Sequence, residues 1–424
     1  MLPTENWQYF KGGCFSDLFG PDIQDNRYGI ILNYPATASW AAYPNTQKYF
    51  IQDGSDEANK VSYDKICQKE PWKNLAVLGD DLTGITTRLP RNILIDYWRD
   101  CFGYRYENIE VLTRSVYLDH LNQSDRFEKI ITLFPFDHLS PEKHAVHPDI
   151  HYNLLSKTTL AKAGVRSPLY KNYNLDETPL DDIPLPQNFP YLIKVSHGLS
   201  GEGTYIIKNS SDLDYTWREI GKYRENKLLT HIIVSEFVKD EIQNYCVQFY
   251  VNKKGEITLI GATQQMVSSE GKFLGGIIDY DKSDILRFKS LIQAIASYAH
   301  NDGYFGVIGC DVLEDKAGEF HVIDINYRIN GSTPLCLQRH RFLGQGKTVA
   351  KYSGDYRING TLDSVLANFK PELDRQDFLI FSALEKVKYG KIYCELYGIV
   401  AGETLEQMVQ TEKNLFQKGL QLLE

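Results

Sequence analysis

The segment Gly303–Thr333 constrains this chain more than any other. Its sequence, GYFGVIGCDVLEDKAGEFHVIDINYRINGST, predicts two apolar strands joined by a turn at residues 316–318. Alternate side chains of a strand share a face, so Asp324 and Asn326 lie together on the second strand. Asp311 on the first strand can face them. Two carboxylates and an amide oxygen are ligands that suit a hard cation such as Mg²⁺.

A simpler interpretation of these acids must be weighed. An acid near a strand end is more often solvated or caps a turn, and short motifs match often by chance. However, Asp311 and Asp324 interrupt apolar strands, where burying an unpaired charge is costly. This cost favours a functional role for the pair.

A second motif lies upstream, where the apolar strand Pro190–Val195 carries Lys194 and runs into a glycine-rich loop. Glycines at positions 198, 201 and 203 permit positive φ, so backbone N–H groups can close over phosphate oxygens. Lys194 can add a point charge. The order differs from a Walker loop, because no Gly-Lys-Ser/Thr follows. Taken alone, most such loops are only turns.

Composition narrows the class of protein. With 424 residues the chain is expected to form two or three domains, and its net charge of −9 argues against a general nucleic-acid binder. No apolar run is long enough to span a membrane, and the first residues do not resemble a secretory signal. The seven cysteines are scattered without a C-x-x-C motif, which predicts reduced thiols and a cytoplasmic location.

The first part of the chain alternates strands and helices, which predicts a parallel α/β sheet. We expect buried strands at Tyr28–Tyr34, Leu75–Gly79 and Ile130–Pro135, and a helix at Asn92–Arg99. Residues 79–81, Gly-Asp-Asp, would then follow a strand at its carboxyl end, where such sheets bind ligands. An ordinary turn with two exposed acids is an equal alternative.

Further elements follow from periodicity. We expect a helix around Lys157 that stops at Gly164, and an amphipathic helix at Asp281–His300 whose apolar stripe belongs to the core. The end of the chain predicts strands at 378–384 and 391–401 and a helix at 404–423.

Two polar groups leave alternatives open. Gln264 and Gln265 close a strand and can orient a substrate, or they are ordinary strand-end amides. Arg339, His340 and Arg341 can serve an anionic substrate, or they face solvent.

The order of these motifs resembles the ATP-grasp ligases, whose metal-binding strands carry an acid and then acid-x-Asn-x-Arg-x-x-Gly, here residues 324–331. The chain is similar to members with a preceding pre-ATP-grasp domain, such as the peptide ligase of pheganomycin biosynthesis and the acyl-carrier-protein ligase of butirosin biosynthesis. The resemblance implies an α/β chain with an α+β ATP-grasp fold. It places an α/β pre-ATP-grasp domain at 1–140, an ATP-grasp core at 141–335 and a C-terminal part of the catalytic lobe with an extension at 336–424. Within the core, the ATP-binding lobe would span about residues 180–250 and the metal-binding strands 303–333.

The resemblance also implies roles for individual residues. The nucleotide phosphates would meet Lys157, Lys194, Gly198, Ser200, Gly201 and Gly203. Glu236, Phe237 and Val238 would meet the adenine edge, and Glu241 and Asn244 the ribose, although Glu241 lies three residues before the usual place of that acid. Asp311, Asp324 and Asn326 would hold the metal, and Arg328 and Lys194 would act in catalysis.

The implied activity is an ADP-forming ligation that uses ATP and Mg²⁺, or Mn²⁺. A carboxylate is activated as an acyl phosphate and joined to an amine of an amino acid or peptide, or to a carrier-protein thiol. A non-ligating ATP-binding regulatory protein and an ATP-grasp kinase are the alternatives. The expected partners are small-molecule substrates, an acyl carrier protein if the acceptor is a thiol, and a second copy in a homodimer.

Overall fold

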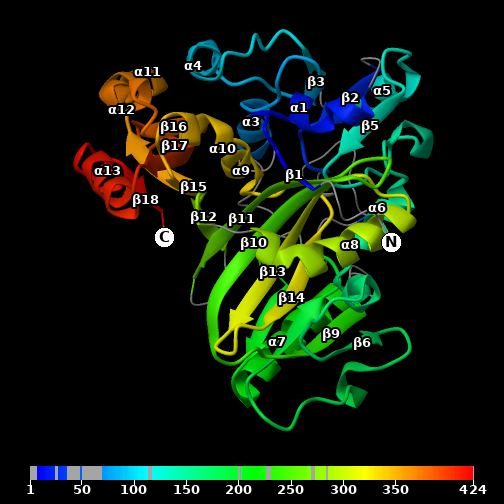
Figure 1. The fold of residues 1–424 in the computed structure, drawn as a ribbon. Coiled ribbons are helices and arrows are strands. Elements are labelled where there is room, and N and C mark those ends of the chain that lie inside the picture. Colours follow the sequence, from blue (N-terminus) through cyan, green and yellow to red (C-terminus); the bar gives the residue numbers. More distant parts are fainter. Residues whose placement is uncertain are drawn as a thin grey trace.

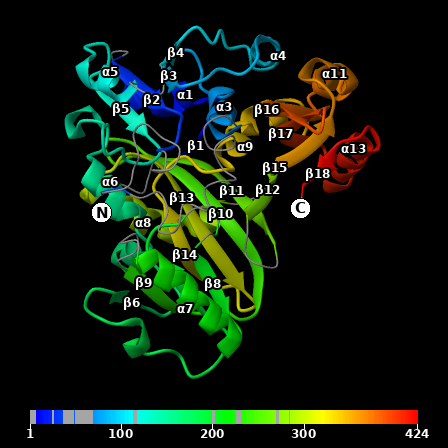
Figure 2. The same ribbon diagram turned by 180° about the vertical axis from the view of Figure 1, so that it is seen from behind.

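The computed structural model describes residues 7–23, 27–35, 48–49, 69–112, 117–198, 201, 203–225, 231–268, 273–282 and 285–423. These residues form three sheets (Figure 1). A small parallel sheet from the first part of the chain lies at one end of a long central sheet, and a four-stranded antiparallel sheet lies at the other end. The view from behind shows the same arrangement (Figure 2).

The parallel sheet confirms the α/β prediction for the first part of the chain. Its strand order is β4-β3-β2-β5, and all three neighbouring pairs are parallel. The strands are β2 (Tyr28–Ile31), β3 (Thr83–Thr86), β4 (Ile109–Val111) and β5 (Lys129–Thr132), and the helices around them are α1 (Phe15–Phe19), α3 (Glu70–Leu75), α4 (Asn92–Phe102) and α5 (Tyr117–Gln123).

The strand predicted at Leu75–Gly79 is wrong. Helix α3 ends at Leu75, and the chain then turns before β3. Residues 75–78 have no exposed surface, so the apolar run reflects burial rather than a strand, and periodicity cannot separate the two in so short a segment. The N–H groups of Phe15 and Ser16 bond to the carbonyls of this buried turn, at 2.8 and 2.9 Å.

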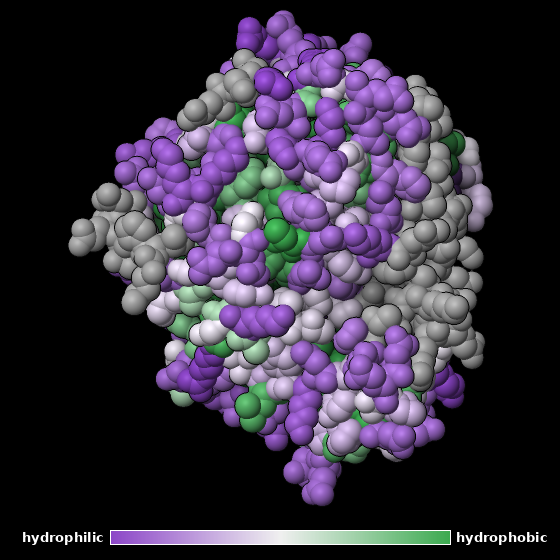
Figure 3. Space-filling model, turned by 90° about the vertical axis from the view of Figure 1, so that its right-hand side faces the viewer, coloured by the Kyte–Doolittle hydropathy of each residue, from purple (hydrophilic) through white to green (hydrophobic). Residues whose placement is uncertain are grey.

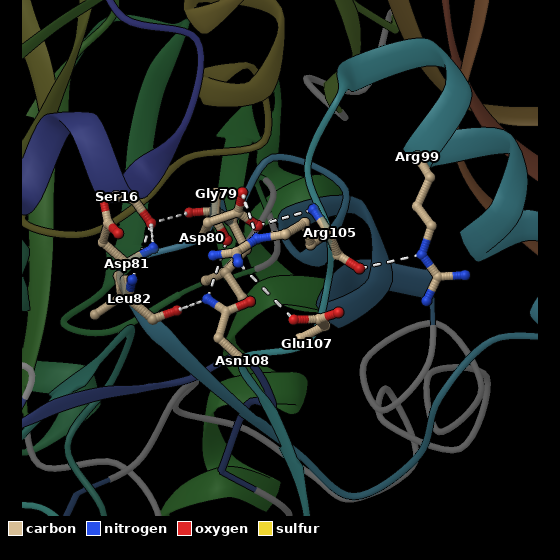
Figure 4. Close-up of polar contacts among 10 residues, drawn as sticks. Ser16, Gly79, Asp80, Asp81, Leu82, Arg99, Arg105, Glu107 and Asn108 are labelled. Carbon is tan, nitrogen blue, oxygen red and sulfur yellow. Dashed lines mark hydrogen bonds and ion pairs between the residues drawn. The ribbon is translucent and has the colours of Figure 1, made fainter.

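Residues 79–81 consequently precede strand β3 and do not stand at a carboxyl end. Asp80 Oδ1 accepts the Arg105 N–H at 2.8 Å, and Ser16 Oγ accepts the Asp81 N–H at 3.1 Å (Figure 4). Asn108 Nδ2 donates to the Gly79 carbonyl at 3.0 Å. These bonds hold residues 79–81 in a turn. They favour the interpretation of this segment as an ordinary turn over that of a ligand site.

The antiparallel sheet has the order β6-β9-β7-β8 and its own small core around Ile193, Ile207, Ile220 and Ile232. Its elements are β6 (Tyr170–Asn174), β7 (Tyr191–Val195), β8 (Thr204–Ile207), β9 (His231–Glu236) and α7 (Ser210–Glu225). The predicted strand that carries Lys194 is thereby confirmed.

The expected helix around Lys157 is split in two. Helix α6 (Pro148–Leu155) ends at Ser156, which has extended backbone angles, and a 3₁₀ helix, η5 (Lys157–Ala163), follows. Gly164 ends it in a left-handed conformation at φ 68°, as expected. The break places Lys157 at the start of η5, where its N–H donates to Ser196 O at 2.8 Å.

The central sheet follows the path β14-β13-β10-β11-β12-β15-β17-β16, with β1 beside β11 and β18 beside β15. Helix α8 (Lys289–Asn301) covers one face of it with a buried stripe that includes Ile292 and Ile295, and the 3₁₀ helix η7 (Ile285–Phe288) precedes α8. The strands are β1 (Gln8–Tyr9), β10 (Glu241–Val251), β11 (Ile257–Val267), β12 (Phe273–Asp279), β13 (Gly306–Asp315), β14 (Phe320–Asn326), β15 (Val349–Asn359), β16 (Phe378–Lys388), β17 (Lys391–Gly402) and β18 (Gln421–Leu422).

The C-terminal segment continues this sheet. Strands β16 and β17 confirm the two predicted strands, but the last helix, α13 (Leu405–Gln417), is shorter than expected, because Gly419 at φ 97° ends it and β18 follows. The domain boundaries at 140 and 335 stay predictions. The short helices of this part are α9 (Thr333–Leu337), α10 (Arg339–Gly344), α11 (Leu362–Asn368) and α12 (Lys370–Asp374).

The surface and the thiols agree with the composition. No helix of the described residues has the length and apolar character needed to cross a membrane. Hydrophilic residues cover most of the face drawn in Figure 3, with a group of hydrophobic ones near its centre. The six cysteines in the described part of the chain are free thiols, and five of them are buried; Cys67 lies outside the described residues.

Two buried histidines near the parallel sheet give a testable pH dependence. Burial lowers the pKa of His144 and of His151 from 6.5 to about 4. His144 Nε2 accepts the Phe136 N–H at 3.2 Å, and His151 Nε2 bonds to Tyr327 O at 2.8 Å. Both rings are therefore neutral when folded, whereas the unfolded chain takes up protons below pH 6.5.

We expect the free energy of unfolding to fall as pH is lowered from about 6.5 to about 4, by about 3 kcal/mol for each histidine. Urea unfolding of His144→Asn across this window should show a shallower slope than the wild type. His340→Gln, which changes an exposed histidine, is the control. Equal slopes for wild type and His144→Asn would contradict the assignment.

Candidate nucleotide and metal site

Asp311 and Asp324 are direct cross-strand partners in the β13–β14 hairpin. Asn326 Nδ2 lies 3.5 Å from Asp311 Oδ2, so the hairpin brings together the three side chains that the sequence proposed as ligands. Burial and the neighbouring Asp324 raise the pKa of Asp311 to about 6. Burial opposes ionisation of Asp324 as well, but the adjacent Lys157 outweighs it and lowers the pKa of Asp324. The pair thus concentrates negative charge at one point of the sheet.

Two lysines from outside the central sheet reach this carboxylate pair. Lys157 Nζ donates to Asp324 Oδ2. Lys194 is buried on β7, and its Nζ donates to Ile323 O at 3.3 Å. Burial, and then repulsion from Lys157, lowers the pKa of Lys194 to about 8. The antiparallel sheet and the β13–β14 hairpin therefore meet where the ammonium groups of Lys157 and Lys194 lie. A polyphosphate requires such positive charge next to it.

The glycine loop joins β7 to β8 beside Lys194. Gly201 and Gly203 have φ of 86° and 75°, a conformation that L side chains rarely adopt. Val195 N–H donates to Gly203 O at 2.8 Å, and a Cβ on Gly203 would stand 2.3 Å from a Val195 methyl. Gly203 is thus fixed by packing as well as by backbone angle, while Gly201 is exposed and Gly198 half-buried. Ser200 lies outside the described residues.

The residues proposed for the base lie where β9 ends. Glu236 is exposed, and its carboxylate accepts the Leu169 N–H at a long 3.4 Å. Phe237 and Val238, both half-buried, follow in the connection to β10. No contact in the described residues tests the role proposed for these residues at the adenine edge.

Asn244 carries a buried polar atom that lacks a partner. Its Oδ1 has no hydrogen bond within the described part of the protein. Asn244 lies two residues from Cys246, which is the cross-strand partner of Asp311, so Asn244 stands on the face of the metal pair. An unpaired buried acceptor is costly, and a ligand hydroxyl would satisfy it. Glu241 is exposed at the start of β10.

Arg328 extends the site beyond the metal pair. Its Nη2 donates to Asn326 Oδ1 at 2.9 Å, its Nη1 donates to Ile329 O at 3.1 Å, and its guanidinium lies 5.1 Å from the Phe134 ring centroid. Phe134 follows β5, so the parallel sheet supports this arginine. Asn326 Oδ1 retains a second lone pair for a cation.

A hollow lies beside Arg328, between the end of β5 and the start of β13. Its enclosed volume is about 30 Å³, room for about one water molecule, and its walls are mostly apolar. The polar residues that line it are Thr132, His151 and Arg328. This volume is far below the roughly 300–1,000 Å³ of typical small-molecule sites.

Sequence reasoning left Gln264 and Gln265 undecided, and the structure separates them. Gln265 Nε2 donates to Asp311 Oδ1 at 2.5 Å, whereas Gln264 is exposed. Arg341 donates to Cys101 O at 2.7 Å, and Arg339 donates to Tyr280 O at 3.4 Å. The two arginines brace neighbouring backbone, and the substrate role suggested for them has no support here.

Sequence reasoning missed a buried polar network beneath the site. Gln248 Nε2 donates to Ser332 Oγ at 2.8 Å, and Thr333 Oγ1 donates to Gln248 Oε1 at 2.6 Å. The network ties the loop after Arg328 to strand β10. A glutamine inside an apolar strand was the available signal, because a buried amide needs partners.

The donor set fits a hard cation that shares its shell with phosphate. Among the described residues, no three His, Cys, Asp or Glu side chains stand together as a metal site. Asp311, Asp324 and Asn326 supply oxygen ligands only, and Mg²⁺ in nucleotide sites is commonly held by one or two carboxylates together with phosphate and water. The protein would therefore provide part of the shell and the nucleotide the rest.

Comparison with known proteins shows which chains this one resembles. A family model described as "L-aspartate--L-methionine ligase, ATP grasp" matches residues 168–326. N5-carboxyaminoimidazole synthetase from Staphylococcus aureus has a similar structure, with 13% identity, a TM-score of 0.54, and 98% of this chain and 99% of that chain covered. L-amino acid ligase from Bacillus licheniformis, at 13% identity, has a TM-score of 0.52 and covers 80% of this chain and 97% of its own. An ADP complex of N5-carboxyaminoimidazole ribonucleotide synthetase gives 12% identity, a TM-score of 0.55, and 81% and 93% coverage.

The carboxylate pair gives a direct prediction. Asp324→Ala combined with Asn326→Ala should abolish ATP turnover and weaken Mn²⁺ binding in the presence of ADP, because two of three oxygen ligands are lost. Asp315→Ala removes an acid from the same hairpin that bonds instead to His321, and it should keep Mn²⁺ binding. Near-normal ADP production by the double variant would show that the metal assignment is wrong.

Proposed function

We propose that this chain is an ATP-grasp ligase that activates a carboxylate as an acyl phosphate and joins it to an amine, releasing ADP and phosphate. The observation that carries the proposal is the opposed pair Asp311 and Asp324 with Lys157, Lys194 and Arg328 around it. A half-buried carboxylate pair beside three cations suits a metal–polyphosphate complex next to a second anion.

Bound Mg·ATP supplies the phosphoryl group and charge neutralisation. The substrate carboxylate attacks the γ-phosphorus, the bond to the β-γ bridging oxygen breaks, and ADP leaves. The amine then attacks the acyl carbon and phosphate leaves, while the amine loses a proton. Lys157 and Lys194 would hold phosphate oxygens, and the loop of Gly198, Gly201 and Gly203 would keep water from the reacting phosphorus. Such transfer depends on positioning and charge more than on a protein nucleophile.

Arg328 would anchor the substrate carboxylate. Its planar fork matches a carboxylate, and a hollow with mostly apolar walls lies beside it. The family model that matches residues 168–326 is named for a ligase of two amino acids, and one structural neighbour is an L-amino acid ligase. We therefore propose amino acids as the substrate class.

Other roles of the same fold stay open to test. A non-ligating regulatory protein would bind ATP without turnover, and a kinase would release ADP without an acceptor amine. A carrier-protein thiol as acceptor and a homodimeric assembly are predictions, as is the cytoplasmic location.

The decisive assay measures ADP release with pairs of L-amino acids and each amino acid alone. We expect release that requires two substrates, together with a dipeptide product detected by mass spectrometry. Release with one substrate and a phosphorylated product would favour the kinase, and ATP binding without release would favour the regulatory protein.

Arg328→Lys should keep ATP affinity but lower acceptor-dependent ADP release. Lysine cannot give the bidentate fork, and loss of a charge-assisted pair costs about 1.5–3 kcal/mol, or about tenfold to a hundredfold in rate. Arg339→Lys is the matched exchange, because Arg339 bonds to Tyr280 O outside the site. If Arg328→Lys lowers only thermal stability and leaves the ratio of ligation to ATP binding intact, Arg328 stabilises the end of its strand and does not bind the substrate carboxylate.

A further inference from the structure

The two carboxylates of the metal site have different partners. Asp324 is paired with the ammonium of Lys157, and its other oxygen accepts the Ile325 N–H at 3.0 Å. Asp311 is held by neutral amides, namely Gln265 at 2.5 Å and Asn326 at 3.5 Å. One carboxylate therefore has a full counter-charge within the protein, and the other has none in direct contact among the described residues.

The Lys157–Asp324 pair is shielded from water. The side chain of Lys157 is 12% exposed and that of Asp324 is 20% exposed. Breaking a shielded pair without replacing a partner is costly, because it leaves a desolvated charge. A divalent cation that arrives alone must break this pair and also stand next to the displaced ammonium.

We propose that Lys157 is a shared counterion: it neutralises Asp324 until nucleotide arrives and then moves to the phosphates, so that metal and nucleotide bind together. The inference rests on the nucleotide site of the proposed function and needs no ligation step. In the absence of nucleotide, Lys157 keeps the divalent cation weakly bound. With nucleotide present, the phosphates take the lysine and Asp324 becomes free to bind the cation.

The backbone and side chain of Lys157 suit this exchange. Its N–H donates to Ser196 O at 2.8 Å, at the end of the strand that precedes the glycine loop, so the base of the side chain is fixed. Its four-carbon stem leaves the ammonium free to reorient. The charged groups around it are Asp324 and Asp311, which attract it, and Lys194, which repels it. This repulsion also favours movement toward an incoming anion.

Lys194 provides the internal comparison. It lies at the same junction, but its Nζ donates to a backbone carbonyl, Ile323 O, at 3.3 Å and is not in direct contact with a metal-site carboxylate. Its substitution should weaken phosphate binding without freeing Asp324. Gln265 gives the opposite comparison, because it positions Asp311 and its loss can only weaken the metal site.

The test measures Mn²⁺ binding by electron paramagnetic resonance, with and without ADP, and ADP binding without metal by calorimetry. In Lys157→Gln, Mn²⁺ alone should bind about tenfold more tightly than in the wild type, while ADP binds more weakly; coupling between sites commonly amounts to about 5–150-fold. Lys157→Arg should restore weak binding of Mn²⁺ alone. Lys194→Gln should weaken ADP binding and tighten binding of Mn²⁺ alone by less than Lys157→Gln does, because Lys194 repels the cation without pairing directly with Asp324. Gln265→Leu should weaken Mn²⁺ binding with and without ADP.

Unchanged or weaker binding of Mn²⁺ alone in a folded Lys157→Gln protein would overturn the inference, as would an equal gain in Lys194→Gln. Thermal unfolding of each variant checks that it is folded. The result is independent of the ligation assay. If two-substrate ADP release fails while Lys157→Gln binds Mn²⁺ more tightly, only the proposed reaction is lost; if ligation holds and Mn²⁺ binding does not tighten, only the shared counterion is lost.

Discussion

Asp311 and Asp324 lie opposite each other in the β13–β14 hairpin, and the charged residues around the site offset the negative charge of this pair. Two carboxylates on directly opposed residues repel, and burial raises the pKa of Asp311 to about 6. Cations from elsewhere in the fold offset this repulsion. Lys157 and Lys194 come from the elements before and within the antiparallel sheet, so this part of the chain supplies counter-charge to the hairpin.

The parallel sheet supports a third cation beside the carboxylate pair, Arg328. Arg328 follows the metal strand, and its guanidinium lies over Phe134, which follows β5. Burial raises the pKa of Tyr34, which follows β2 and packs edge-on against Phe134 at 5.3 Å between ring centroids. The carboxyl ends of two parallel strands therefore form an aromatic support for the arginine, at the edge where open α/β sheets bind ligands.

Much of the candidate site could be predicted from the sequence, because its residues lie in short local patterns. The hairpin places Asp311, Asp324 and Asn326 by the alternation of a strand, and Lys194 and the glycines are neighbours in the chain. Local patterns gave wrong secondary-structure predictions where contacts between distant segments determine the backbone conformation. The run at 75–78 is apolar because it is buried as a turn, and the break at Ser156 separates two helical segments that share one apolar period. The partners of Arg328 and Gln265 lie on distant segments, and no local pattern links them.

The buried network around Gln248 shows why the loop after Arg328 holds its position. Gln248 lies on β10, two residues from the partner of Asp311, and it binds Ser332 and Thr333 at 2.8 and 2.6 Å. Asn330 adds a bond to Arg328 O at 2.9 Å, and a Cβ on Gly309 would clash with its amide. The strand that faces the metal hairpin thus also anchors the backbone of the arginine. A shift of β10 would therefore move Arg328 together with the Asp311–Asp324 pair, which preserves the distance between them.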